Sequence, residues 1–394
     1  MNILRRSRQI LAALLLLSLL LLSACGAGTE ETGAEKSDLP QTAGPASRDE
    51  PGRPSAAPAG QESPAPQAIE PKGMVYYTYF DTVSYVYDYA GDSAERFEDR
   101  SAEVSHILSE YHQLFDIYHE YSGITNLCTI NKNAGGAPLE VDRKLIDFLL
   151  CAREMYTLTD GEMNVMLGAV LRLWHDCREA AGEDPKNASV PEEAALREAY
   201  AHTGIELLEI DEEHNTVRIA DPEASIDVGA LGKGYATERA AEYLESVGAE
   251  GYVLNIGGNI RCIGDRPDRS GWKTAIRDPA QDGQGYACKI RIRDTACVTS
   301  GVYERYFTVK GQRYHHIIDR DTLYPADYFA SLTVVTRDSA LADALSTALF
   351  CMPAEQGMEL AESIGGVELL WIFPDGRMQW TPGFADLIEE IPEN

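Results

Sequence analysis

The sequence is poor in basic residues: 34 Lys and Arg stand against 63 Asp and Glu, which gives a formal net charge of -29. Proteins that bind nucleic acid neutralise its phosphates with Lys and Arg, so this deficit argues against nucleic acid as a partner. It also sets a condition on any anionic substrate. An acidic protein that binds a diphosphate needs a cation or a local cluster of hydrogen-bond donors at the site.

The chain also lacks any Cys-x-x-Cys pair and any His at zinc-finger spacing, so no zinc site of the usual kind is expected. An odd number of cysteines follows Cys25, and they cannot all pair within one chain. We therefore expect most of them to be small buried hydrophobic residues rather than redox or metal groups. These cysteines are Cys128, Cys151, Cys177, Cys262, Cys288, Cys297 and Cys351.

The apolar run near the N-terminus is short. It extends from Ile10 to Leu22, too few residues to cross a hydrocarbon core of about 30 Å as a helix. Three arginines precede it and Leu22-Ser23-Ala24-Cys25 closes it, which predicts an export signal over residues 1–24. Cys25 at the cut point matches a lipobox, and an ordinary signal peptide with a chance Cys is the alternative. Because two or more acyl chains hold a protein stably on a bilayer, we expect lipidation at Cys25 and a lipid-anchored protein on the extracytoplasmic side of the cell membrane.

After the lipidated Cys, residues 25–72 are rich in Pro, Ala, Gly, Ser, Glu and Asp and contain almost no large apolar residue. No core can form there, which predicts a disordered tether. Residues 73–394 show no internal repeat and no second linker, so we expect one domain. Helical and strand patterns are interleaved but strands also cluster, which predicts a mixed α+β architecture rather than a regular βαβ repeat.

Hydrophobic periodicity places the main elements of this domain. Alternation predicts a strand over Val75–Tyr89. Apolar residues at helical spacing predict helices over Ala94–Tyr118, over Asp142–Leu158 and around Leu167–Trp174. Farther along we expect a helix over Leu231–Val247, a strand over Tyr252–Ile256, several strands between Trp272 and Thr336, and a helix capped by Asp338 that runs through Phe350.

A glycine-rich segment, Ile226–Tyr235, precedes and opens one of these helices, with glycines at 229, 232 and 234. Exposed backbone N–H groups at a helix start bind phosphate well. The segment is not a P-loop, which needs four residues between Gly and Gly-Lys and then Ser or Thr, and it is not a G-x-G-x-x-G dinucleotide fingerprint. From these residues alone, a phosphate site and a plain tight turn remain about equally open.

Asp343 and Thr347 are four residues apart on a predicted helix, so their oxygens share one face. Carboxylate, hydroxyl and backbone carbonyl oxygens suit a hard cation such as Mg²⁺ that keeps some of its waters. The alternative is an Asp near a helix N-terminus, where the helix dipole favours it, with Thr347 merely packed. Taken alone, the pair favours this second interpretation.

His315 and His316 are adjacent within a strand-like segment. Neighbouring side chains on a strand point to opposite faces, so only one of the two can face a site. A lone histidine on a strand is most often structural, and a general base is the less common outcome.

In sequence order, these segments resemble the ApbE family, the FAD:protein FMN transferases, from about Phe80 to Trp380. The matching pieces are Phe80-Asp81-Thr82; Phe115–Tyr118 with Ser122–Asn131; Thr159–Val165 with Gly168 and Leu173-Trp174, similar to T-D-G…F-D-P…G-P-L…L-W; Ile226–Tyr235, similar to D-L-G-G-I-A-K-G-Y; Asn255–Asn259, similar to N-x-G-G-D; Thr299-Ser300-Gly301; His316–Asp319; and Ala342–Thr347.

The resemblance implies an ApbE-type (T-fold-like) domain that transfers FMN from FAD to a Ser or Thr hydroxyl of an acceptor protein, with Mg²⁺ as cofactor and AMP as product. It implies His316 as the base and Asp343, Thr347 and the Ala230 carbonyl as Mg²⁺ ligands. The implied FAD contacts are Phe80, Tyr118, Met163, Asn164, Val165, Asp227 and Lys233.

Family acceptors carry a short S/T-G-A-S/T motif, so exported flavoproteins and membrane redox subunits are the implied partners. Thr32-Gly33-Ala34-Glu35 in the tether fails this motif at its last residue, and self-modification is not expected.

Three positions depart from the family pattern. Asp319-Arg320-Asp321-Thr322-Leu323 stands in place of D-P-x-T-G, Met163-Asn164 in place of Phe-Asp, and Gly229-Ala230 in place of Gly-Gly. Two other functions also stay open: an FAD pyrophosphatase with water as acceptor, and a flavin- or solute-binding lipoprotein without catalysis. The predicted metal pair and His316 favour catalysis over binding alone.

Overall fold

The structure is a computed structural model that describes residues 70–281 and 285–392. The predicted export signal, Cys25 and all but the last residues of the predicted tether lie outside the described residues. Among the helices of the described part, none is both long and apolar enough to cross a membrane.

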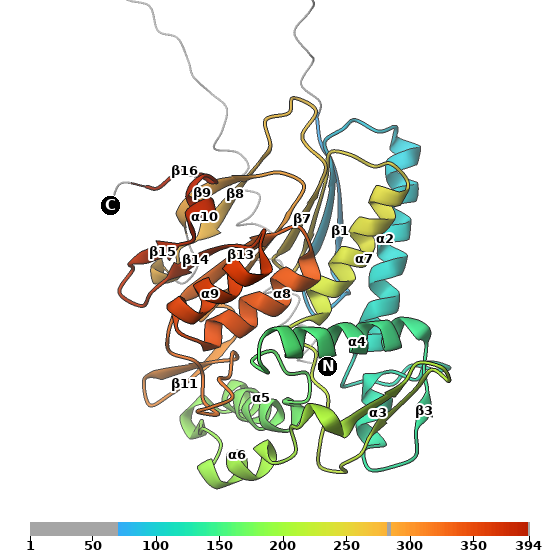
Figure 1. The fold of residues 1–394 in the computed structure, drawn as a ribbon, viewed down its shortest axis with the longest axis vertical. Coiled ribbons are helices and arrows are strands. Elements are labelled where there is room, and N and C mark those ends of the chain that lie inside the picture. The colour runs from blue at the N-terminus through green and yellow to red at the C-terminus, as the bar shows by residue number, and fades with distance from the viewer. Residues whose placement is uncertain (1–69, 282–284, 393–394) are drawn as a thin grey trace, which may run out of the picture. The chain divides into compact units, whose positions relative to one another are not determined.

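An antiparallel sheet of eight strands forms the centre of the fold, in the order β1-β2-β6-β7-β10-β13-β14-β15 (Figure 1). Its strands are β1 (Lys72–Tyr76), β2 (Ser84–Asp88), β6 (Tyr252–Ile256), β7 (Asn259–Ile263), β10 (Ala296–Gly301), β13 (Ser331–Thr336), β14 (Glu368–Ile372) and β15 (Met378–Trp380).

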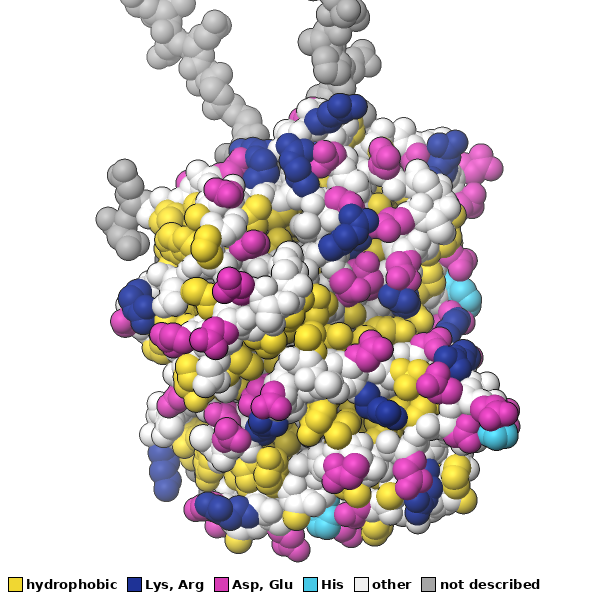
Figure 2. All heavy atoms as spheres, viewed as in Figure 1, with side chains coloured by type: hydrophobic (Ala, Val, Ile, Leu, Met, Phe, Trp, Pro, Cys, Tyr) yellow, Lys and Arg dark blue, Asp and Glu magenta, His cyan; other side chains and the backbone are white. Residues whose placement is uncertain are grey.

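Helices α2 (Ala94–Phe115), α7 (Gly232–Ser246), α8 (Ser339–Ala348) and α9 (Ala354–Ile364) cover one face of this sheet (Figure 1). They bury the apolar stripes that the helical spacing predicted, such as Val104, Leu108 and Tyr111 of α2, against inward-pointing strand residues such as Val86 and Leu254. Figure 2 shows acidic and basic side chains interspersed over this side of the molecule, with hydrophobic side chains gathered across its middle.

A second sheet of three strands packs on the opposite face: β8 (Trp272–Arg277), β9 (Tyr286–Ile292) and β16 (Ile388–Glu390), in the order β16-β9-β8. Cys262 and Cys297 of the large sheet and Cys288 of β9 are buried between the two sheets. All the cysteines after Cys25 are free, and five of the seven are fully buried, as expected from the sequence.

The remaining elements lie beyond one end of the large sheet (Figure 1). A three-stranded sheet is formed by β3 (Leu139–Glu140), β5 (Thr216–Ile219) and β4 (Leu208–Asp211), and a hairpin by β11 (Tyr306–Val309) and β12 (Gln312–His315). The helices here are α3 (Leu127–Lys132), α4 (Arg143–Leu158), α5 (Gly168–Glu183) and α6 (Glu193–Tyr200). The short α10 (Pro382–Ala385) lies elsewhere, beside the three-stranded sheet that contains β16 (Figure 1). Interleaved helices and clustered antiparallel strands confirm the predicted mixed α+β architecture.

Most predicted elements are present within a residue or two of their expected bounds, and two predictions were wrong. The strand expected over Val75–Tyr89 is instead the pair β1 and β2, because Phe80 and Asp81 adopt left-handed φ values of 54° and 52° that break an extended chain. Helix α2 ends at Phe115 rather than Tyr118. There the Asp116 carboxylate accepts the N–H groups of Tyr118 (2.7 Å) and His119 (2.9 Å), which turns the chain out of the helix.

The turn at Asp319–Leu323, where the family pattern ends in Gly, keeps a backbone that normally requires Gly. Leu323 has φ 61°, and its N–H donates to the Asp319 carbonyl (2.8 Å). Its side chain is nevertheless buried, and its carbonyl accepts the indole N–H of Trp174 (2.9 Å). Packing of the leucine side chain thus offsets the strain of the left-handed conformation.

This balance makes a prediction about substitutions at Leu323. Both Leu323→Gly and Leu323→Ala lose a buried side chain, which lowers the free energy of unfolding by about 2–5 kcal/mol. Only the Ala variant keeps the left-handed strain, of about 1 kcal/mol or more, so it should be the less stable of the two. Urea unfolding of both variants measures the difference. An Ala variant as stable as the Gly variant would show that the turn carries no such strain.

Candidate active site

The glycine-rich segment forms a tight turn that leads directly into α7. The Val228 carbonyl accepts the N–H groups of Leu231 (3.1 Å) and Gly232 (2.8 Å), and the Asp227 carboxylate accepts the N–H of Gly229 (2.8 Å). Helix α7 then begins at Gly232. These bonds occupy the N–H groups of Gly229, Leu231 and Gly232, so the donors that remain at this helix start are the N–H groups of Lys233 and Gly234.

One of these donors is taken by a carboxylate from another helix. Asp343 of α8 is 4% exposed, and its Oδ2 accepts the N–H of Gly234 at 2.8 Å. Only glycine permits this approach, because a Cβ at position 234 would lie 2.3 Å from both the Asp343 Cβ and the Ser339 carbonyl oxygen. The structure thus brings Asp343 to the glycine-rich turn, although more than a hundred residues separate them in the sequence.

The groups around Asp343 match the oxygen donors that Mg²⁺ prefers. The second oxygen of Asp343, Oδ1, lies 3.8 Å from the Lys233 ammonium, while Thr347 follows one turn later on α8 and Ala230 lies in the turn, both half-buried. Within the described residues no three His, Cys, Asp or Glu side chains are grouped for a metal ion. A cation here would therefore have one carboxylate, with carbonyl, hydroxyl, water or phosphate oxygens completing its shell, which is the usual pattern for Mg²⁺.

The electrostatics of Asp343 point the same way. Burial raises the pKa of this carboxyl group, although the Lys233 ammonium, the Gly234 N–H and the Asn259 side chain oppose the increase. Because the pKa is raised in spite of these three groups, a cation bound beside Asp343 would further stabilise its charged form. The residues present therefore fit the implied metal.

The two adjacent histidines have separate environments. His315 is buried, with Nε2 at 2.9 Å from the Ala326 carbonyl oxygen and Nδ1 accepting the N–H of Ile317 at 3.3 Å. Both of its ring nitrogens are therefore engaged within the fold. His316 is exposed, as expected if only one of the pair faces a site.

The His316 ring is held in the form that a base requires. Its Nδ1 lies 3.3 Å from the Arg305 carbonyl oxygen. A carbonyl only accepts, so Nδ1 carries the proton and Nε2 is left free to take one up. Reduced hydration within the site and the positive charges of Arg305 and Lys233 lower the pKa of His316, which keeps the ring neutral at physiological pH.

An aromatic and cationic cluster lies within electrostatic reach of Arg305. The Tyr118 ring is 53% exposed, and its centroid lies 5.3 Å from that of His175 on α5. Arg178, one turn along α5, donates to His175 Nδ1 at 2.8 Å. Partial burial and the nearby Asp227 raise the pKa of Tyr118, while Arg178 and Arg305 oppose that increase, so all these groups lie within electrostatic reach of one another.

Asp227 is the acidic centre of this cluster. Burial raises the pKa of Asp227, whereas the Gly229 N–H and the charges of His175, Arg305 and Arg178 oppose the increase. The sequence analysis identified Tyr118 and Asp227 but not His175, Arg178 or Arg305. The only signal for His175 and Arg178 was their three-residue spacing on a helix, which cannot say what the helix faces.

At Met163, Asn164 and Val165, the groups available to a ligand are mainly backbone atoms, because the side chains are buried or hydrogen-bonded within the fold. The side chains of Met163 and Val165 are buried in the hydrophobic core. The Asn164 carboxamide accepts the N–H of Met166 and donates to the Thr203 carbonyl, both at 2.9 Å. The Val165 carbonyl accepts the N–H of Asp227 at 2.8 Å, so this segment positions Asp227 in the site.

Phe80 lies in the left-handed turn between β1 and β2. Its N–H donates to His112 Nδ1 at 3.3 Å, and its half-buried ring meets the His112 ring edge-on at 5.7 Å. The turn packs against the glycine hairpin between β6 and β7, where a Cβ at Gly257 would lie 2.5 Å from the Thr82 methyl carbon. No interaction of the Phe80 ring with Asp343, His316 or Tyr118 is present among the described residues, although Asp81 contributes to the high pKa of Tyr118.

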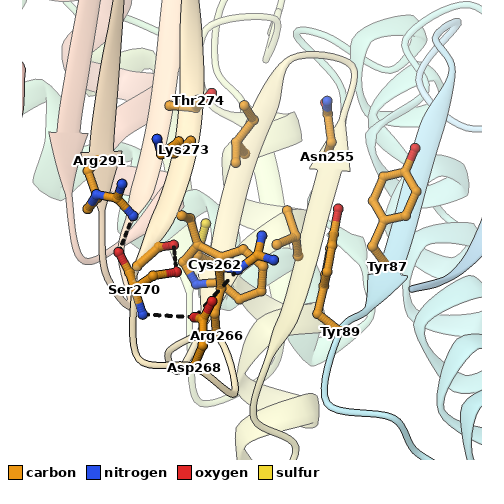
Figure 3. A pocket seen from close by; sticks show the side chains of 14 residues that line it. Tyr87, Tyr89, Asn255, Cys262, Arg266, Asp268, Ser270, Lys273, Thr274 and Arg291 are labelled. Atoms are coloured by element: carbon orange, nitrogen blue, oxygen red, sulfur yellow. Dashed lines mark hydrogen bonds and ion pairs between the residues drawn. The ribbon is translucent and has the colours of Figure 1, made fainter. Parts of the chain in front are cut away.

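A cavity of about 440 Å³ lies apart from these residues, on the sheet face opposite the helices (Figure 3). Its walls include Tyr87 of β2, Tyr89 just after β2, Asn255 of β6 and Trp272 of β8. The guanidinium of Arg266 lies over the rings of Tyr89 (5.2 Å) and Trp272 (5.6 Å). None of the predicted site residues lines this cavity, so the candidate active site is the group that extends from Asp343 through Lys233, His316 and Arg305 to Tyr118.

Comparison with known proteins shows which family this chain resembles. Residues 79–371 match the model of the ApbE family. The FAD:protein FMN transferase of Treponema pallidum is 34% identical over 67% of this chain and 75% of that protein, and the one from Vibrio cholerae is 33% identical over 66% and 75%. Among solved structures, the ApbE protein from Thermotoga maritima superimposes with a TM-score of 0.71 at 27% identity, covering 82% of this chain and all of that one. The flavin transferase ApbE from Vibrio cholerae gives 0.67 at 27%, over 81% and 99%.

Proposed function

The chain belongs to the ApbE family, and from this premise we propose that it is a transferase that moves FMN from FAD to a Ser or Thr hydroxyl of an acceptor protein and releases AMP. One observation carries the proposal. Three distant segments meet at one place: the buried carboxylate of Asp343, the glycine-rich turn, and the neutral ring of His316, the proposed base. The charge of Lys233 acts on both Asp343 and His316.

We propose that Asp343, Thr347 and the Ala230 carbonyl hold Mg²⁺. When bound, the ion would polarise the pyrophosphate and offset its negative charge beside an acidic chain. Lys233 adds a fixed positive charge 3.8 Å from Asp343 Oδ1. The backbone N–H of Lys233, at the start of α7, adds a hydrogen-bond donor for a phosphate oxygen. Phe80 and Tyr118, with the backbone of residues 163–165, are the proposed contacts for the rings of FAD.

His316 is the proposed general base. Its Nε2 takes the proton of the acceptor hydroxyl, while the Arg305 carbonyl keeps the proton on Nδ1 in place. The hydroxyl oxygen then forms a bond to the phosphorus of the FMN phosphoryl group, and the bond from that phosphorus to AMP breaks. Holding the reacting groups in position and stabilising their charge supply most of the rate.

Hydrolysis of FAD is the competing outcome, because the exposed ring of His316 can also reach water. The acceptor, by analogy with the family, carries an S/T-G-A-S/T motif and belongs to exported or membrane flavoproteins. Measuring AMP release from FAD with and without an acceptor protein separates transfer, hydrolysis and binding alone.

The histidine pair gives the sharpest test of the base. His316→Ala should abolish FMN transfer while FAD still binds and the domain stays folded. His315→Ala should lower the melting temperature, because two buried hydrogen bonds are lost, yet retain activity per folded molecule.

The pH dependence tests the same base. Because the pKa of His316 is lowered from the usual value of 6.5, its ring becomes protonated only at a pH below that value. We therefore expect kcat/KM to stay flat at neutral pH and to fall only in more acidic solution. Equal loss of activity in both variants, or an acid limb at or above that value, would contradict the assignment of His316.

The metal prediction compares two variants on one helix face. Asp343→Asn removes the charged ligand and should stop AMP release. Thr347→Val, nearly isosteric, should give a milder defect that higher Mg²⁺ partly restores. Chelation should stop the reaction of the unaltered protein without unfolding it, because a core of this size is stable without metal. Isothermal titration with Mg²⁺ and an AMP assay measure these effects. Full FMN transfer by Asp343→Asn in the presence of chelator would exclude the metal mechanism.

We propose that Cys25 carries the lipid anchor and places the domain on the extracytoplasmic face of the membrane. Cys25→Ser should release the protein from membranes and leave FMN transfer intact, since every proposed site residue lies beyond position 72. Fractionation after washing without detergent checks this expectation. A variant that stays with the membrane fraction would show that Cys25 is not the anchor.

A further inference from the structure

We infer that Arg305 is a further catalytic residue: its guanidinium contacts the phosphoryl group that is transferred, while its carbonyl oxygen holds His316 as the base. The inference rests on the proposed function and adds a residue to it. It starts from the place of Arg305, between β10 and β11, directly before Tyr306 and next to His316 in space.

The Arg305 side chain is exposed and uncommitted. Within residues 70–281 and 285–392, no carboxylate forms an ion pair with it and no hydrogen bond uses its guanidinium. Its neighbour Glu304 instead pairs with Arg277 at 3.0 Å. The chain has 63 acidic and 34 basic residues, so most of its cations can find a carboxylate partner. Within the described part of the chain, the Arg305 guanidinium forms no such ion pair and lies beside the proposed base, which suggests that it binds an anion from outside the protein.

The surrounding charges favour an anion at this point. The positive charges of Arg305 and of Lys233 on α7 both act on His316, and the other titratable neighbour, His315 of β12, is buried and neutral. The carboxylate within reach of Arg305 is Asp227, which already accepts the Gly229 N–H and is shared with His175 and Arg178 of α5. Lys233, Arg178 and Arg305 thus stand against two carboxylates, Asp227 and Asp343, which leaves an excess of one positive charge near His316.

Arginine suits the chemistry proposed here. As the acceptor oxygen bonds to phosphorus and the bond to AMP breaks, negative charge spreads over the non-bridging oxygens of the phosphoryl group. A planar guanidinium can donate two parallel N–H groups to two such oxygens. The guanidinium and the carbonyl that orients His316 belong to the same residue. The positive charge and the base would therefore keep a fixed position relative to each other.

The test compares Arg305→Ala and Arg305→Lys with the unaltered chain, and Arg313→Ala serves as a matched control. Arg313 lies on the same hairpin, and its guanidinium covers the Tyr306 ring at 4.5 Å. Its replacement removes an equal charge without touching His316. FMN transfer to an acceptor protein is measured at saturating FAD, and FAD affinity by flavin fluorescence.

We expect Arg305→Ala to lower kcat about 100-fold, as loss of an oxyanion donor does in other enzymes, with little change in FAD affinity. Arg305→Lys should keep part of the rate, and added guanidinium ion at a non-denaturing concentration should restore part of it to Arg305→Ala. Loss of a positive charge next to His316 should also move the acid limb of kcat/KM to higher pH. Arg313→Ala should stay within about twofold of the unaltered rate, in line with the small effects of surface changes.

Three outcomes would each overturn the inference. The first is an Arg305→Ala rate close to that of the unaltered chain, and the second is an equal loss of rate in Arg313→Ala. The third is a loss of rate in Arg305→Ala that guanidinium does not restore, together with an unchanged acid limb of kcat/KM. Because Arg305 is exposed, a melting temperature near that of the unaltered chain is expected, and Arg305→Lys preserves the test if Ala disturbs the loop. Absence of FMN transfer by the unaltered protein would instead contradict the proposed function itself.

Discussion

The hydrogen bond from the Gly234 N–H to the Asp343 carboxylate joins two helices that are distant in sequence, and the geometry of the site depends on it. It fixes where α8 crosses the start of α7, and it brings the one carboxylate of the proposed metal site to the backbone donors of the glycine-rich turn. Any side chain at position 234 would force the helices apart, since even a Cβ would lie 2.3 Å from Asp343. The glycine therefore serves the close packing of the two helices.

The distribution of charge follows a similar logic. The chain is strongly acidic, yet the candidate active site gathers Lys233, Arg178 and Arg305 around two half-compensated carboxylates, Asp343 and Asp227. Burial raises the pKa of each carboxyl group, and neighbouring cations oppose the increase. Such a site suits the proposed binding of a cation together with a polyanion, because each ligand offsets the charge of the other.

The histidine pair shows how one strand end serves both stability and chemistry. His315 uses both ring nitrogens in hydrogen bonds inside the fold, whereas His316 uses one nitrogen on the Arg305 carbonyl and leaves the other exposed. Burial or the neighbouring charges lower the pKa of both rings, so both are neutral near pH 7. The same protonation state therefore suits a structural role for His315 and the role of base that we propose for His316.

The sequence alone determined the α+β class, most helices and strands, and the residue types on which the site would depend. Apolar periodicity and caps such as Asp338 are local signals, and they placed α4, α7, α8 and β6 closely. Local signals could not show that Val75–Tyr89 folds back on itself at Phe80, because left-handed φ values at non-glycine residues follow from packing against the β6–β7 hairpin.

Only the tertiary structure decided which candidates meet. It brought Asp343 to Gly234, and it buried the side chains of Met163 and Val165 in the core. It also brought His175, Arg178 and Arg305 to Tyr118 and Asp227. Distances between segments a hundred residues apart arise from the packing of helices on a sheet, and no periodicity within a single segment encodes them.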